Sequence, residues 1–194
     1  MRIIAGALKG RRLAAPSWPG LRPTSDRLRE TLFNVLGARV AGARVVDACA
    51  GTGAVGLEAL SRGAAHVTFV EPDRRAVALI GRNLAHCGVA EAYTMIPAAV
   101  EAVGARLEPR SADLVVMDPP YDAADLASFV GHGARWLAPG GWLVLEHAAR
   151  RDAPEAAGGL ARFRRLAAGD SALSFYAAAD APGAASPPGA RHEP

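Results

Sequence analysis

Four consecutive residues, Asp118-Pro119-Pro120-Tyr121, have the clearest potential for chemistry, and they follow an apolar run. The Asp118 carboxylate and the carbonyl of Pro119 can accept hydrogen bonds from an amine and turn its nitrogen lone pair outward. The two prolines restrict the backbone and so hold these acceptors in place. Tyr121 can stack on a base that has left its helix. We interpret the run as a candidate catalytic site for the exocyclic amine of a base; the structural alternative is a rigid turn.

A second run, further upstream, has the features of a cofactor-binding loop. The apolar segment that ends at Asp47 continues into Ala50-Gly51-Thr52-Gly53. Glycines in such a turn let a nucleotide-like ligand approach the backbone. A carboxylate just before the turn suits the ammonium group of S-adenosylmethionine, which also carries a positive sulfonium and has no phosphate. The sequence therefore predicts S-adenosylmethionine as the cofactor.

The same loop also fits a dinucleotide fingerprint, because residues 51–56 read G-x-G-x-x-G. Glu71 ends the next predicted strand, where an acid can hold the hydroxyls of a ribose. A nicotinamide-dependent oxidoreductase is therefore an alternative from these residues alone. A dinucleotide uses the helix N-terminus for its pyrophosphate, whereas the carboxylate of Asp47 is better explained by the cationic ligand.

Alternating strands and helices must position these residues. The predicted strands cover 45–48, 67–70, 93–96, 114–117 and 142–146, and the predicted helices cover 54–62, 73–86 and 123–137. This alternation is typical of a doubly wound, Rossmann-like α/β fold, in which ligands bind at the carboxyl ends of the strands. A last hairpin, 163–166 with 173–176, is expected to close the edge of the sheet.

A further helix is predicted before the first of these strands. Thr24 or Ser25 can cap its start, and Gly37 can end it. Its apolar positions share one face and are Leu28, Leu32, Val35 and Leu36. This pattern leaves Arg27 and Arg29 off the buried face.

Positive charge is concentrated in the N-terminal segment. Residues 1–44 contain nine basic and two acidic residues, so this segment carries +7, whereas the rest of the chain carries −4. Glycines within residues 1–22 predict a small β-hairpin, whose basic residues are Arg2, Lys9, Arg11 and Arg12. Such local charge indicates a polyanionic nucleic-acid partner. An exposed basic face without a partner is the alternative.

Length and composition fit one catalytic domain, since 194 residues with 51% hydrophobic residues can bury one sizeable core. The two cysteines, Cys49 and Cys87, cannot supply a metal site, so no metal is expected. The sequence shows no apolar run of about 20 residues and no secretory signal. We therefore expect a cytoplasmic protein with no membrane contact, and we expect a monomer.

The chain resembles the bacterial 16S rRNA (guanine(966)-N2)-methyltransferase family up to about Tyr176. The resemblance is carried most specifically by LRPTSDRLRETLFN at 21–34, and also by RIIAG at 2–6 and KGRRL at 9–13. It implies methyl transfer from S-adenosylmethionine to the 2-amino group of a guanine, in 16S rRNA of a partly assembled small ribosomal subunit. It also implies a class I methyltransferase fold with a small N-terminal β-hairpin and helix extension.

Residue roles follow from the resemblance by position. The residues expected to bind the cofactor are Asp47, Ala50, Gly51, Thr52, Gly53 and Glu71, and those expected to hold the guanine are Asp118 to Tyr121. Arg22, Thr24, Arg27 and Arg29, with the basic hairpin, are expected to face RNA or the mouth of the pocket. The expected parts are a basic appendage over 1–22, a methyltransferase domain over 23–178 and a disordered tail over 179–194.

The chain departs from related enzymes after the third strand, where they often place an Asp or Asn near the cofactor adenine. Here residues 96–99 read Ile-Pro-Ala-Ala, so backbone groups around Ala98, or the side chain of Glu101, are the candidates. Two alternatives to the implied function stay open. One is a DNA adenine-N6 or cytosine-N4 methyltransferase, although the chain has little room for a domain that reads DNA sequence. The other is a non-catalytic RNA-binding assembly factor.

Overall fold

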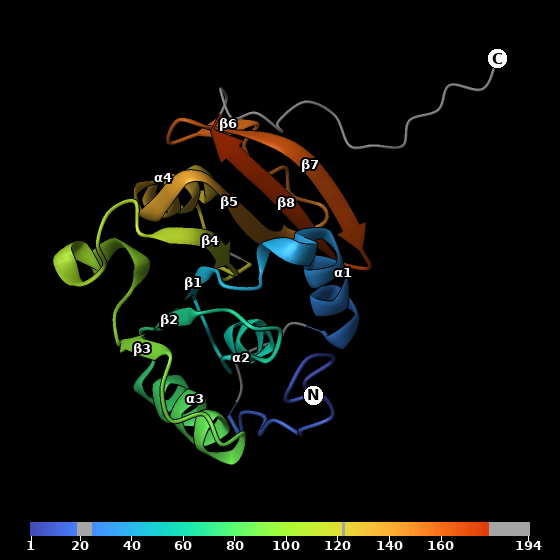
Figure 1. Ribbon diagram of the computed structural model, residues 1–194. Coiled ribbons are helices and arrows are strands. Elements are labelled where there is room, and N and C mark those ends of the chain that lie inside the picture. The colour runs from blue at the N-terminus through green and yellow to red at the C-terminus, as the bar shows by residue number, and fades with distance from the viewer. Residues whose placement is uncertain (19–24, 122, 179–194) are drawn as a thin grey trace.

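The fold is built around one eight-stranded sheet, seen in Figure 1, in a computed structural model that describes residues 1–18, 25–121 and 123–178. The strands are β1 (Arg44–Ala48), β2 (His66–Val70), β3 (Tyr93–Ile96), β4 (Ala112–Met117), β5 (Leu137–Ala148), β6 (Ala156–Ala157), β7 (Leu160–Ala168) and β8 (Ser171–Ala178). The α-helices are α1 (Asp26–Leu36), α2 (Ala54–Ser61), α3 (Arg74–His86) and α4 (Leu126–Trp136).

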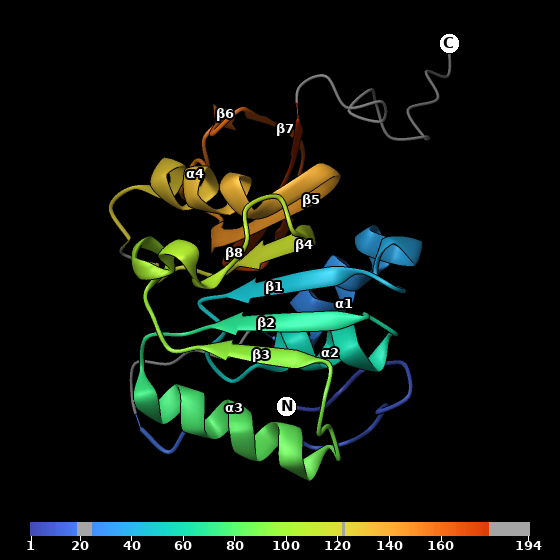
Figure 2. The same ribbon diagram turned by 60° about the vertical axis from the view of Figure 1, so that its left-hand side comes forward.

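The sheet has the order β3-β2-β1-β4-β5-β8-β7-β6, with its first five strands parallel and the last three joined antiparallel. Apolar residues of α1, α2 and α3 pack with one face of the sheet, and those of α4 pack with the other. Figure 2 shows α1 and α2 behind the parallel strands. The predicted doubly wound, Rossmann-like fold is confirmed. The strand order reverses between β1 and β4, which is where such sheets bind ligands.

The strands and helices lie close to their predicted positions, with differences in the C-terminal half. Helix α4 begins at Leu126 rather than at 123, because Asp125 caps it by accepting a hydrogen bond from the Ser128 N–H. The predicted last hairpin forms as β7 and β8 beside β5, and the two-residue β6 lies outside it at the edge of the sheet. In the described residues no helix is long and apolar enough to cross a membrane.

Helix α1 is capped as predicted, but its buried face is different. The Ser25 hydroxyl accepts the Leu28 N–H, and Gly37 ends the helix with a φ of 53°. The prediction that Arg29 lies off the buried face is wrong, because this side chain is fully buried. Its Nη2 donates to the carbonyl of Arg2 and to the carboxylate of Asp26. Residues near the start of the chain, among them Arg2, cover this position of the helix. The helix's own periodicity does not reveal this contact.

The described part of the predicted appendage, residues 1–18, packs onto the body of the domain. It forms a single antiparallel bridge, between Arg2 and Arg12, rather than two extended strands. Ile3 is buried in the main core, and the N–H groups of Ile4 and Ala5 donate to the fully buried carboxylate of Glu58 in α2 at 2.7 and 3.0 Å. These contacts fix the course of the segment across the end of α2.

Candidate active site

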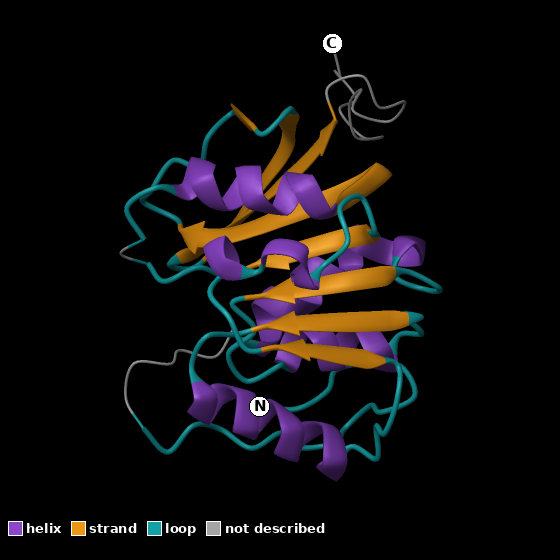
Figure 3. Cartoon of the chain, turned by 90° about the vertical axis from the view of Figure 1, so that its left-hand side faces the viewer, coloured by secondary structure: helices purple, strands orange, loops and turns teal. Residues whose placement is uncertain are grey.

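A cleft of about 780 Å³ lies at the carboxyl edge of β1 and β4, where the strand order reverses. Figure 3 shows the arrowheads of the parallel strands reaching this common edge. The predicted residues that line the cleft are Asp47, Ala50, Gly51, Thr52, Glu71, Asp118, Pro119, Pro120, Tyr121 and Arg27. The fold thus brings together the two sequence runs, which are about 70 residues apart in the chain.

Asp47 lines the cleft and is almost completely buried, with 3% of its surface exposed. Its Oδ2 accepts the N–H of Gly56, in the first turn of α2, at 2.8 Å. Burial raises the pKa of Asp47 to about 8; the Gly56 hydrogen bond opposes this, and the nearby Asp118 and Glu71 raise it further. A cationic ligand beside this carboxylate would favour its charged form.

Glu71 supports the cofactor loop directly. One carboxylate oxygen accepts the N–H of Gly51 at 2.8 Å, and the other accepts the N–H of Asp73 at 2.9 Å. These two bonds tie the end of β2 to the turn after β1. Each oxygen keeps a further lone pair, so the carboxylate can also accept from the hydroxyls of a ribose.

The Asp118 to Tyr121 run is fixed from three sides. The N–H of Asp118 donates to the carbonyl of Ala48 at 3.2 Å, which ties the end of β4 to the end of β1. The Tyr121 hydroxyl forms a hydrogen bond with the hydroxyl of Ser171, the first residue of β8. Arg151 donates to the carbonyl of Tyr121 at 3.0 Å. The acceptors of this run are therefore held by neighbouring strands and by the loop after β5.

Two residues predicted to bind the cofactor lie away from the cleft lining. Gly53 precedes α2 with a φ of 75°, and a Cβ at this position would meet Ile80 at 3.0 Å. It therefore shapes the turn and packs against α3. Ala98 is buried, and its N–H donates to the carbonyl of Ile96 at 2.9 Å. Its backbone donor is thus engaged within the chain.

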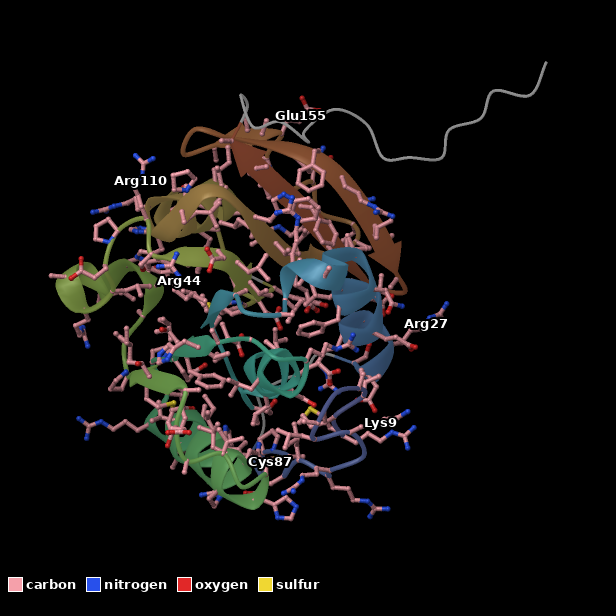
Figure 4. All side chains as sticks on the ribbon, in the orientation of Figure 1. Lys9, Arg27, Arg44, Cys87, Arg110 and Glu155 are labelled. Carbon is pink, nitrogen blue, oxygen red and sulfur yellow. The ribbon has the colours of Figure 1, made fainter. Side chains whose placement is uncertain are left out.

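The basic residues of the N-terminal segment spread from the cleft towards the opposite edge of the sheet. Arg27 lines the cleft, whereas Lys9 belongs to a turn in which the Leu8 N–H donates to the Ser61 hydroxyl, at the far end of α2. Helix α2 has eight residues, which separates the two ends by about 12 Å. Figure 4 shows Lys9 and Arg27 on one side of the molecule, and Arg110 on the other.

The remaining basic candidates differ in their surroundings. Arg2 and Arg12 are exposed, and Arg11 donates to the carbonyl of His86, at the end of α3, at 3.2 Å. Arg22 and Thr24 lie outside the described residues.

Sequence reasoning missed two acidic residues that line the cleft, Asp170 in the turn between β7 and β8 and Glu146 near the end of β5. Glu146 ends the apolar run Trp-Leu-Val-Leu at 142–145. Asp47 and Glu71 follow apolar runs in the same way, and this shared pattern was the signal that could have found it.

The whole described body matches one protein family. The family model described as "Conserved hypothetical protein 95" matches residues 1–177. Ribosomal RNA small subunit methyltransferase D of Escherichia coli K12 is 35% identical over 178 residues, covering 91% of this chain and 89% of the relative. The protein of the same name from Haemophilus influenzae is 35% identical over 150 residues, covering 75% of this chain and 78% of the relative.

A solved structure agrees with this match. A hypothetical protein of Thermus thermophilus is 32% identical and superposes with a TM-score of 0.76, covering 90% of this chain and 98% of that one. The resemblance stated from the sequence motifs is therefore confirmed. The chain belongs to the family of ribosomal RNA small subunit methyltransferase D.

Proposed function

We propose that this protein transfers one methyl group from S-adenosylmethionine to the 2-amino group of a guanine in 16S rRNA of the small ribosomal subunit. The observation that carries the proposal is the position of the Asp118 to Tyr121 run, which shares one cleft with the Asp47 loop at the strand-order reversal. The relatives' name adds the small-subunit RNA as substrate class.

The cleft suits a cationic cofactor. Among the described lining residues, Arg27 is the single basic side chain, whereas the acidic ones are Asp47, Glu71, Asp118, Glu146 and Asp170. This excess of carboxylates would attract the sulfonium and the ammonium of S-adenosylmethionine. In the proposed arrangement Asp47 orients the ammonium group, Glu71 accepts from the ribose, and the Gly51 backbone lies against the ligand. The bound cofactor supplies the methyl group and a sulfur leaving group.

The protein's part in the reaction is to prepare the amine. The lone pair of an exocyclic amine is delocalised into its ring, so the nitrogen is a weak nucleophile. Asp118 and the carbonyl of Pro119 accept its two hydrogens and favour a pyramidal nitrogen that faces the methyl group. Tyr121, held by Ser171, stacks on the extruded base. Positioning and fixed acceptors supply the rate enhancement.

The experiment that tests this function measures methyl transfer from labelled S-adenosylmethionine to four substrates in parallel. These are unmethylated small subunits, their assembly intermediates, free 16S rRNA and duplex DNA, each followed by nucleoside analysis. We expect N2-methylguanosine, preferentially on the subunits or intermediates. N6-methyladenine or N4-methylcytosine in DNA would favour a DNA methyltransferase instead, and no label on any substrate would favour a binding role.

A further inference from the structure

Glu146 is a buried carboxylate in the cleft that contributes negative charge but has no direct role in the proposed methyl transfer. It is 6% exposed, lies near the end of β5 and lines the same cleft as Asp118 and Tyr121. On the neighbouring β8 it is paired with Leu173, which also lines the cleft. A carboxylate so far removed from water, at the wall of a ligand cleft, is well placed to accept a hydrogen bond from a polar group of the ligand.

The sheet register places Glu146 beside Asp118. Met117, the last residue of β4, is aligned with Leu145 of β5, so Asp118, which follows β4 directly, comes next to Glu146. Side chains alternate along a strand, and both of these lie two positions beyond the aligned pair Val116 and Val144. They therefore occupy the same face of the sheet, on neighbouring strands about 4.8 Å apart.

Guanine has a pattern of donors that matches two adjacent carboxylates. Its ring N1–H lies next to the 2-amino group, so the two groups point from the same edge of the base. Adenine and cytosine carry a ring nitrogen without hydrogen beside their amino group, which is an acceptor. An ionised carboxylate facing that position therefore accepts a hydrogen bond from guanine and repels the other two bases.

We propose that Glu146 selects guanine at this site by accepting the N1–H of the base whose 2-amino group lies at Asp118 and Pro119. The inference rests on the proposed methyl transfer to guanine. It adds the reason why this site takes guanine, although an Asp-Pro-Pro-Tyr run serves the amines of adenine and cytosine equally well. A site built to accept this hydrogen bond rejects an analogue that lacks the donor, because a buried carboxylate is then left facing an acceptor.

The test compares guanine with 2,6-diaminopurine, which keeps the 2-amino group but has an acceptor at N1. Small subunits are reconstituted with 16S rRNA carrying either base at the position that the wild-type protein methylates, and kcat/KM is measured for both. We expect the wild-type protein to prefer guanine by at least about 10²-fold. Glu146→Gln should reduce this preference at least about tenfold, because its amide can donate a hydrogen bond to the N1 of diaminopurine.

Matched variants separate base selection from a structural role. Glu146→Asp keeps a carboxylate and should keep the preference for guanine. Glu146→Ala removes the carboxylate and should lose this preference. Glu91→Gln neutralises an exposed carboxylate outside the cleft and should leave the preference unchanged. Calorimetry measures the binding of S-adenosylmethionine to each variant, so that a change in cofactor affinity is separated from a change in base preference.

The possible outcomes distinguish this inference from the function on which it rests. If the wild-type protein methylates guanine but its preference persists in both Glu146→Gln and Glu146→Ala, only the role of Glu146 is overturned. A wild-type protein that accepts both bases equally overturns it as well. If the wild-type protein methylates no guanine in small-subunit RNA, the proposed function fails, and the inference fails with it.

Discussion

At the scale of single residues, the ionisation of Asp47 links the cofactor site to stability. Its pKa of about 8 lies well above the ordinary value of 3.8. Between about pH 4 and pH 8 the folded protein therefore keeps a proton that the unfolded chain has already released near pH 4. Without ligand, the contribution of the Asp47 carboxyl group to the free energy of unfolding is present below about pH 4. It is lost as the pH rises from about 4 to about 8.

We predict that Asp47→Asn removes this pH dependence. The amide oxygen can still accept the Gly56 N–H, but the side chain no longer titrates. From pH 4 to pH 8 the stability of the wild-type protein should fall relative to the variant, by at most about 1.4 kcal/mol per pH unit. Urea unfolding of both proteins at several pH values measures this difference. A constant difference across the range would contradict the raised pKa.

Substitution of Asp118 should affect methyl transfer and cofactor binding to different extents. Asp118→Ala removes one of the two proposed amine acceptors, so turnover should fall about 10²–10³-fold. Its effect on the dissociation constant of S-adenosylmethionine should be small. Asp118→Asn keeps an acceptor oxygen and should retain far more activity than the alanine variant. Single-turnover methylation and calorimetry measure the two quantities, and a variant that binds RNA and keeps full turnover would refute the site assignment.

At the scale of elements, the turn of the N-terminal segment depends on a close contact with the end of α2. Gly6 has a φ of 82°, and a Cβ there would lie 1.8 Å from the carbonyl oxygen of Ser61. Gly10 has a nearly identical φ of 84°, but a Cβ there would meet no atom within 4 Å. The two glycines therefore share one backbone requirement and differ in their surroundings.

This difference predicts unequal costs for the same substitution. Gly6→Ala should destabilise the protein by about 1–3 kcal/mol more than Gly10→Ala, because only the first forces the segment away from α2. The free energy of unfolding of both variants, measured in urea, provides the comparison. Equal losses would mean that the segment does not pack against Ser61 in solution.

At the scale of the whole molecule, the basic N-terminal segment offers a surface that runs beyond the cleft. We predict that replacing Arg11 and Arg12 together by alanine weakens RNA binding and reduces the slope of log affinity against log salt. Each lost phosphate contact should change the slope by about 0.7–0.9. Cofactor affinity should be almost unchanged, since neither residue lines the cleft.

The control is a pair of exposed arginines on another surface, Arg106 and Arg110, in the connection between β3 and β4. Replacing this pair by alanine makes the same change in net charge. Its effect on the salt dependence should be smaller, because Figure 4 shows Arg110 on the side of the molecule opposite Lys9. Equal effects of the two pairs would point to a general effect of charge rather than to a defined RNA-binding surface.

The sequence by itself determined the alternating strands and helices and the edge at which Asp47, Glu71 and Asp118 meet. Apolar runs and caps are local signals, and parallel strands necessarily end at one edge of their sheet. The same reasoning missed Glu146, although it ends an apolar run in the same way, because its role depends on the register between β4 and β5.

Only the tertiary structure decided the environments of Arg29, Gly53 and Ala98. Arg29 is buried because a distant segment lies over α1, and its guanidinium reaches the carbonyl of Arg2. Gly53 packs against Ile80 and Ala98 turns into the core, so neither lines the cleft. The periodicity of a helix or strand fixes which way a side chain points along its own element. Which other segment it then meets is a non-local property, set only when the elements pack together.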